Sequence, residues 1–425
     1  MLFFFILGDI LGAGIYALVG EVAGEVGGAV WTAFMAALVL ALFTAFAYAE
    51  LITKYPRAGG AALFVNRAFG IPVVTFLVTF AVMASGITSA STLSRAFGGD
   101  YLQEFVSVPT TLAALVFVVV VALINFRGIR ESVRTNMVLT LVEVTGLVII
   151  VIIGIFALGN AETEVGRNFE FKEGEGAFLA ILAGTALAFY ALIGFEDSAN
   201  VAEEAQDPVR SFPFALFAGI LVAGVIYFLV TFTASMVVPT AQLGESSAPL
   251  LEVVARASDI PTKVFSAIAL LAIANGALIN LVMASRLLYG MSNEGILPRA
   301  FSTVHPGRRT PWVAILFTTL LAVLLISIGK LEDLAVVTVM LLLAVFAMVN
   351  VAVLVLRREP VEHRHFVAPS IFPILGLVIS LVLLVKRVID EDATVYVLLG
   401  VLLLVAALLW VVNRMLTDRT EQTQG

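Results

Sequence analysis

The chain has 425 residues, of which 61% are hydrophobic and only 13% are charged. A composition this apolar, with a mean hydropathy of +1.07, excludes a soluble globular protein and indicates several membrane spans. The formal net charge is −7. The chain has no cysteine, which excludes disulfides and thiolate metal sites.

Twelve apolar runs are long enough to cross a bilayer, which takes roughly 20 residues. In chain order they lie at 1–24, 28–53, 72–97, 110–127, 137–159, 177–204, 211–238, 264–291, 312–329, 333–356, 369–386 and 394–413. The first run has neither the basic start nor the small-residue cleavage site of a signal peptide, so we count it as a span. The sequence therefore predicts an all-α membrane protein with twelve transmembrane helices.

The first and the sixth run contain glycine and an acidic residue where the middle of a span should lie. Residues 8–16 read Gly-Asp-Ile-Leu-Gly-Ala-Gly-Ile-Tyr, and residues 189–197 read Phe-Tyr-Ala-Leu-Ile-Gly-Phe-Glu-Asp. A break within the bilayer frees backbone N–H and C=O groups, so it must be buried in protein or line a polar cavity. Two such breaks, five spans apart, indicate the substrate site of a transporter built from inverted repeats.

The basic residues predict the orientation in the membrane. Sixteen of the 24 Lys and Arg residues fall on the side that carries both termini, and cytoplasmic loops are the ones enriched in Lys and Arg. We therefore expect both termini in the cytoplasm, the acidic loop at 162–175 outside, and a location in the plasma (inner) membrane.

Short motifs distributed along most of the chain point to one family. They are Gly-Ala-Gly-Ile-Tyr at 12–16, Tyr-Pro-Arg-Ala-Gly-Gly at 55–60, Arg-Ala-Phe-Gly at 67–70, Gly-Phe-Glu at 194–196, Ser-Arg-Leu-Leu-Tyr at 285–289, Gly-Ile-Leu-Pro at 295–298 and Arg-Thr-Pro at 309–311. As a set, in this order, they resemble the amino acid–polyamine–organocation (APC) transporters.

The resemblance implies a LeuT-like fold and secondary transport of amino acids or related amines. Residues 1–159 would form the first repeat of five helices and residues 160–356 the second, inverted one. Residues 357–425 would add two peripheral helices and a short cytoplasmic tail. Members of the family usually carry a polar segment before the first helix, whereas this sequence opens on the helix itself. Either the sequence begins late or the inner gate closes without that segment.

The first break suits a substrate carboxylate. A helix that starts near Ile15 presents free N–H groups and the positive end of its dipole to an anion. We assign the carboxylate to the amides of Ala13, Gly14 and Ile15, with Gly12 and Gly14 allowing close approach because they lack a Cβ. The alternative is that these glycines only allow tight helix packing.

For the second break, the resemblance implies the ammonium ligands and a gate. By position, Tyr190, Ala191 and Ile193 match the residues whose carbonyls bind the substrate ammonium in the family. Phe195 matches the aromatic residue that covers the substrate from outside. The alternative for Phe195 is ordinary apolar packing, since the chain has 31 phenylalanines.

Placing a carboxylate within a membrane span costs free energy, so carboxylates found there are candidates for coupling to an ion. Glu143 lies well inside the fifth span, where burial disfavours the charged form of a carboxyl group, so it is the leading proton carrier. Asp9 and Glu196, beside the two breaks, are further candidates for proton or ion coupling. A structural ion pair or hydrogen bond is the alternative for Glu143, and a helix cap is the alternative for Glu196. Sodium is less favoured because residues 267–284 contain no Ser or Thr.

The leading hypothesis is an amino acid permease that works by alternating access as a proton symporter. The alternatives are an exchanger of amino acids or amines without ion coupling, and a receptor that binds without transport. A channel is disfavoured because two broken helices in one chain favour a single central site. We expect no enzyme activity, cofactor, bound metal or nucleic-acid partner. The expected partners are an amino acid or amine, protons (with sodium as the less favoured ion), and the lipid bilayer.

Overall fold

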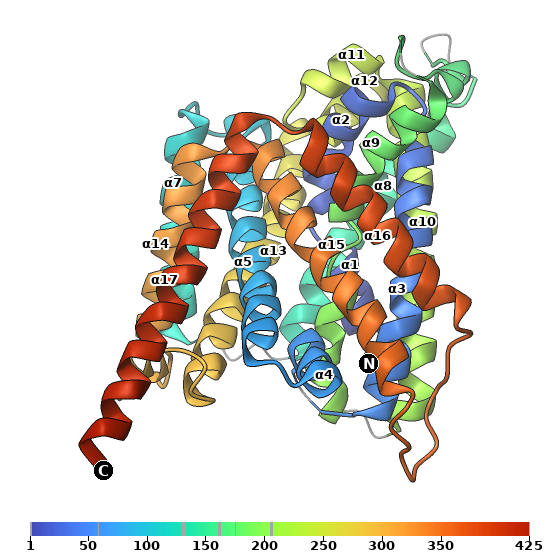
Figure 1. Cartoon of the computed structure of the whole chain (residues 1–425). Helices are drawn as coiled ribbons and strands as arrows, with labels where there is room; N and C mark the ends of the chain where they lie inside the picture. Colours follow the sequence, from blue (N-terminus) through green and yellow to red (C-terminus); the bar gives the residue numbers. More distant parts are fainter. Residues whose placement is uncertain are drawn as a thin grey trace.

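The computed structural model describes residues 2–57, 59–128, 133–159, 163–174, 176–204 and 207–424. Within these ranges the chain is helical and contains no β-strand. Among the described residues, ten helical segments are long and apolar enough to cross a membrane, counting the interrupted segment Leu2–Val26 as one. They pack side by side in one bundle, and the N and C labels both lie in its lower half (Figure 1).

The long helices follow the apolar runs of the sequence. They are α3 (Val30–Lys54), α5 (Pro72–Phe97), α7 (Thr110–Arg127), α8 (Val133–Ala157), α10 (Pro208–Val237), α13 (Thr262–Asn293), α15 (Leu331–Leu356), α16 (Ile371–Asp390) and α17 (Ala393–Gln424). Two other apolar runs form shorter helices, α9 (Ala177–Tyr190) and α14 (Trp312–Ile328). Short helices connect the long ones: α4 (Gly60–Phe69), α6 (Asp100–Gln103), η1 (Val165–Phe169), α11 (Thr240–Glu245), α12 (Pro249–Ala257) and η3 (Arg299–Ser302).

The first and sixth predicted spans are both interrupted. In the first, α1 (Leu2–Ile10) ends and α2 (Gly14–Val26) begins after residues 11–13. In the sixth, α9 ends at Tyr190, residues 191–194 form turns, and η2 (Phe195–Glu204) continues as a 3-10 helix. The turn depends on Gly194, because residues other than glycine rarely adopt its φ of +126°. Ser198 then donates its hydroxyl to the carbonyl of Phe195, a local bond that competes with α-helical bonding.

The two breaks pack against each other. A Cβ added to Gly14 would lie 2.7 Å from the Cα of Ala191, and a Cβ added to Gly194 would lie 2.6 Å from the carbonyl oxygen of Asp9. Only glycine allows backbone segments to approach this closely. The contact therefore brings the middle of the first span onto the middle of the sixth.

Burial separates inner from outer helices. In α5 and α15, 67% of the most apolar window is buried, against 28% in α16 and in α17. The outer position of α16 and α17 leaves apolar side chains exposed along them, which suits contact with lipid.

A charged network fixes the chain after α15 to the end of α3. Glu50 is 1% exposed and accepts hydrogen bonds from Nε (2.8 Å) and Nη2 (2.6 Å) of Arg357. The backbone N–H of Ala368 donates to the same carboxylate at 2.8 Å. The hydrogen bonds to Glu50 raise the pKa of Arg357, so the guanidinium stays charged. Glu50 therefore pairs with the segment that follows α15.

Candidate functional site

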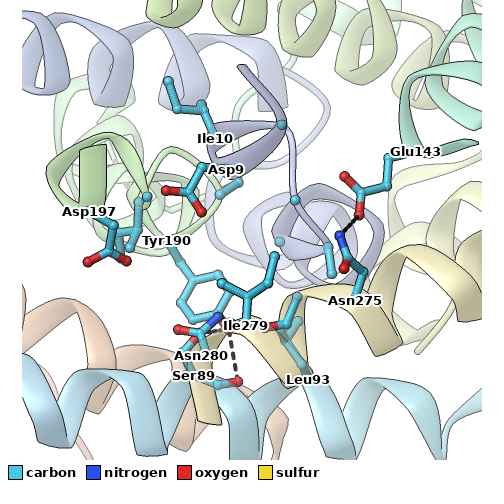
Figure 2. A pocket seen from close by; sticks show the side chains of 18 residues that line it. Asp9, Ile10, Ser89, Leu93, Glu143, Tyr190, Asp197, Asn275, Ile279 and Asn280 are labelled. Atoms are coloured by element: carbon cyan, nitrogen blue, oxygen red, sulfur yellow. Dashed lines mark hydrogen bonds between the residues drawn. The ribbon is translucent and has the colours of Figure 1, made fainter. Parts of the chain in front are cut away.

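A cavity of about 60 Å³ lies where the two breaks meet (Figure 2). Its volume is several times the roughly 10–15 Å³ that one water molecule needs. Its walls come from both breaks and from α5, α8 and α13. The lining residues are Gly8, Asp9, Ile10, Gly12, Ala13, Gly14, Ser89, Leu93, Glu143, Tyr190, Ala191, Ile193, Gly194, Asp197, Asn275, Gly276, Ile279 and Asn280.

Most of the site residues predicted from the sequence line this cavity, and three do not. The three are Ile15, Phe195 and Glu196, which are all buried elsewhere. Sequence reasoning missed the wall that Ser89 and Leu93 of α5 provide. The small and hydroxyl-bearing residues between Ser85 and Ser94 were the available signal, because such residues cluster at helix interfaces within membranes.

The first break exposes the start of α2 to the cavity. Ala13 is the N-cap residue and has no side chain that could accept a hydrogen bond from the first amides of α2. The positive end of the helix therefore lacks an intrinsic cap, which leaves it available to an anion. Gly12 and Gly14 differ here. A Cβ on Gly12 would meet only the Asp9 carbonyl at 3.4 Å, whereas a Cβ on Gly14 would run into Ala191.

The second break offers carbonyl groups that are already partly engaged. The carbonyl of Tyr190 accepts the N–H of Ile193 at 3.3 Å, and that of Ala191 accepts the hydroxyl of Tyr227 at 2.8 Å. The same hydroxyl lies 2.7 Å from the carbonyl of Ile10 at the end of α1. Tyr227 of α10 thus bridges the two breaks. A buried tyrosine inside the apolar run 211–238 was the signal for this contact, because a buried tyrosine hydroxyl usually finds a partner.

Tyr190 also forms part of the cavity wall. Its hydroxyl lies 2.9 Å from the hydroxyl of Ser89, so a hydrogen bond joins α9 to α5 across the cavity edge. Figure 2 shows the ring of Tyr190 between Asp197 and Ser89.

Three carboxylates line the cavity, those of Asp9, Glu143 and Asp197. Glu143 is 1% exposed, and its Oε1 accepts a hydrogen bond from Asn275 of α13 at 3.0 Å. No described residue donates a hydrogen bond to its Oε2, although that atom is buried. The backbone carbonyl of Glu143 accepts the hydroxyl of Tyr16 at 2.6 Å, which ties α8 to α2.

Glu196 does not line the cavity. Its Oε2 accepts the backbone N–H of Gly194 at 2.9 Å and so caps the turn that ends the second break. This contact is the one expected if Glu196 acts as a helix cap. A role for Glu196 in ion coupling stays a prediction.

Phe195 lies in an aromatic cluster beside the break. Its ring centre is 5.8 Å from that of Tyr48 in an edge-to-face contact and 5.4 Å from that of Phe346. Phe195 is fully buried and does not reach the cavity wall in this conformation. Its role as a gate stays a prediction.

Sequence comparisons identify the family of the chain. The family model described as amino acid permease matches residues 1–412. The branched-chain amino acid permease BcaP of Bacillus subtilis (strain 168) is 28% identical, over 88% of this chain and 83% of its own. The low-affinity putrescine importer PlaP of Escherichia coli (strain K12) is 27% identical, over 74% of this chain and 70% of its own. Cationic amino acid transporter 4 of Homo sapiens is 30% identical, over 82% of this chain and 58% of its own.

These relatives are transporters rather than enzymes, and the family match covers nearly the whole chain. The helices described above supply the apolar spans that a multi-pass membrane protein requires. The chain therefore belongs to the amino acid permease family.

Proposed function

We propose that the chain is a secondary active transporter that moves amino acids by alternating access. Supporting observations are the two interrupted helices, their direct contact, and the cavity between them. We further propose twelve spans in a LeuT-like arrangement, with residues 1–159 and 160–356 as inverted repeats and α16 and α17 outside them. Breaks that line a cavity at the repeat interface are typical of this kind of transporter.

In the proposed complex the substrate carboxylate binds the amides of Ala13, Gly14 and Ile15. The uncapped start of α2 supports this assignment. The substrate ammonium binds the carbonyls of the second break, at Tyr190, Ala191 and Ile193. Because Tyr227 already donates to Ala191, the ammonium shares that carbonyl with the tyrosine hydroxyl.

Transport is proposed to be coupled to protons through Glu143. Its buried Oε2 has no hydrogen-bond donor among the described residues, and a bound proton would neutralise the carboxyl group in this low-dielectric position. Adding or removing one unit of charge there changes the local electrostatic energy by several kcal/mol at reduced dielectric. A change of that size is enough to shift an inward–outward equilibrium.

Uptake by proteoliposomes that contain the purified protein tests this function. Uptake should rise as the external pH falls and should need no sodium. Glu143→Gln, which mimics the protonated form, should lose accumulation driven by a pH gradient but keep exchange of external for internal substrate. Glu294→Gln, at an exposed position on the end of α13, is the matched control and should behave as wild type.

The same assay separates the other candidates. An exchanger would take up substrate only when the liposomes contain substrate, and a receptor would bind without uptake in either condition. Sodium-dependent accumulation, or a pH response that survives in Glu143→Gln, would move the coupling site to another residue, with Asp9 as the next candidate.

We also propose that the protein lies in the plasma (inner) membrane with both termini in the cytoplasm. The excess of Lys and Arg on the side of the termini supports this orientation. Because the sequence has no cysteine, single cysteines can report the topology directly. In intact cells an impermeant maleimide should label Lys172→Cys and leave Arg364→Cys unlabelled; the reverse pattern would invert the orientation.

A further inference from the structure

The segment 303–311, which leads from η3 into α14, carries the Arg-Thr-Pro motif and contributes no residue to the cavity. It is closed on itself by two backbone hydrogen bonds. The N–H of His305 donates to the carbonyl of Thr310 at 2.9 Å, and the N–H of Arg309 donates to the carbonyl of His305 at 2.8 Å. Arg309 has a φ of +56°, in the left-handed region that residues other than glycine seldom adopt. Strained residues of this kind cluster at sites that bind ligands.

Contacts with the end of α7 hold this segment in place. The hydroxyl of Thr310 donates to the carbonyl of Phe126 at 3.1 Å. The guanidinium of Arg308 lies 5.3 Å from the centre of the Phe126 ring, a cation–π contact. Gly128 ends α7 in a left-handed conformation, and a Cβ on it would lie 3.1 Å from the methyl carbon of Thr310. The segment therefore packs directly on the residues that end α7.

Three arginines lie at this contact: Arg127, the last residue of α7, and Arg308 and Arg309 of the segment. All three are exposed. The ion pairs found among the described residues include none of them, so no described carboxylate lies within ion-pair distance of their guanidinium groups. The planar fork of a guanidinium matches the oxygens of a phosphate group, so the three arginines together suit a phosphate ligand.

An apolar surface that suits lipid begins next to these arginines. Helices α7 and α14 pack against each other at one flank of the bundle (Figure 1). Along them, the side chains of Leu123, Leu316 and Leu320 are exposed by half or more. Trp312, the first residue of α14, is 42% exposed, and tryptophan is enriched where the headgroups of a bilayer meet its hydrocarbon. The arginines therefore lie at the level of the headgroups and the leucines at the level of the acyl chains.

We propose that Arg127, Arg308 and Arg309 bind the headgroup of an anionic phospholipid whose acyl chains follow α7 and α14. The arginines supply positive charge and N–H donors for the phosphate, and the exposed leucines supply an apolar surface for the chains. A free phosphate ion would use the arginines only, so the two features together favour a lipid. The site is separate from the substrate cavity, and the inference is independent of the proposed transport function.

Native mass spectrometry of the purified protein, titrated in detergent with phosphatidylglycerol or phosphatidylcholine, tests the proposal. Wild type should bind phosphatidylglycerol at least about tenfold more tightly, because both lipids carry a phosphate and acyl chains but only phosphatidylglycerol has a net negative charge. Arg309→Gln should weaken that binding about fivefold, which corresponds to the roughly 1 kcal/mol that one basic residue contributes near an anionic membrane surface. Arg364→Gln, at an exposed position between α15 and α16, is the matched control and should bind as wild type does.

Tryptophan fluorescence locates the bound lipid. Trp31→Phe combined with Trp410→Phe leaves Trp312 as the single tryptophan. In phosphatidylcholine vesicles, added brominated phosphatidylglycerol should quench Trp312 more strongly than the same amount of brominated phosphatidylcholine. Adding Arg127→Gln and Arg309→Gln to this protein should remove the difference, and a difference that persists would place the lipid elsewhere.

Equal affinity for the two lipids in the wild-type protein would overturn the proposal, and that comparison needs no variant. Equal losses in Arg309→Gln and Arg364→Gln would also overturn it, because they would indicate a general attraction to a basic surface. Inorganic phosphate at the same concentration should not displace phosphatidylglycerol; displacement would assign the arginines to free phosphate instead of a lipid.

Discussion

The contact between the two breaks makes a prediction about two glycines of the first break. Intrinsic propensity alone suggests that alanine at Gly14, the first residue of α2, would stabilise the protein by up to about 1 kcal/mol. The structure predicts a loss of stability instead. The new Cβ would lie 2.7 Å from the Cα of Ala191 and 3.2 Å from a ring carbon of Tyr190. The clash is with backbone, which cannot rotate away as a side chain can, and overpacking of this kind costs about 1–3 kcal/mol.

We therefore expect Gly14→Ala to be less stable than wild type by about 1 kcal/mol, because overpacking outweighs propensity. Gly12→Ala is the matched control, since its Cβ meets only the Asp9 carbonyl at 3.4 Å and the residue has no positive φ. It should unfold at the wild-type temperature or slightly above, since replacing glycine restricts the unfolded chain. Its methyl group occupies cavity space, so its substrate affinity should fall.

Thermal unfolding in detergent, followed by tryptophan fluorescence, measures the first effect, and equilibrium binding measures the second. If Gly14→Ala unfolds at the same temperature as Gly12→Ala, the close contact between the breaks is wrong. If Gly12→Ala binds substrate as wild type does, Gly12 does not face the substrate.

Three further substitutions probe features outside the cavity wall. Tyr227→Phe removes the hydroxyl shared by two buried carbonyls and should cost about 1–3 kcal/mol of stability while slowing uptake; unchanged unfolding and uptake would show that the bridge is dispensable. Arg357→Ala leaves the Glu50 carboxylate buried without its cation and should cost about 3 kcal/mol, most of which Glu50→Gln should restore in the double variant. Phe195→Ala should lower the unfolding temperature, because it removes about 3–5 kcal/mol of packing free energy. If the ring also gates the site, the substitution should impair uptake more than binding. A wild-type uptake rate would show that Phe195 is a packing residue only.

The apolar helices were predictable because hydropathy and length suffice to recognise them. The run at 110–127 forms a helix with those same ends, since Pro109 precedes it and Gly128 ends it in a left-handed conformation. The two breaks were also predictable, because a continuous span rarely carries glycine beside an acid in its middle. The 3-10 form of η2 was not, since it depends on a turn at Gly194 that the sequence alone does not fix.

The cavity lining was predictable along the broken helices and, on α8, at Glu143, because a carboxylate deep inside a span is itself a signal. Residues of the two breaks carry motifs, so Gly12 and Tyr190 could be placed in the cavity before the fold was known. The place of Ser89 in the cavity wall and the contact of Tyr227 with both breaks could not be predicted, because they depend on which face of an otherwise regular helix points inward. Gly14 was given a substrate role from its lack of a Cβ, but the structure adds that the missing atom makes room for Ala191.

The single hydroxyl of Tyr227 has a consequence for any movement of the first span relative to the sixth. A phenol has one hydrogen to donate, and here two carbonyls, of Ile10 and Ala191, lie within reach of it. Either carbonyl can therefore leave while the hydrogen stays bonded to the other. The first and the sixth span can withdraw from each other in turn without ever leaving a buried donor unsatisfied. In the proposed alternating-access cycle, Tyr227 would therefore keep its hydroxyl bonded while the two spans separate, which would lower the free energy of the intermediate arrangement.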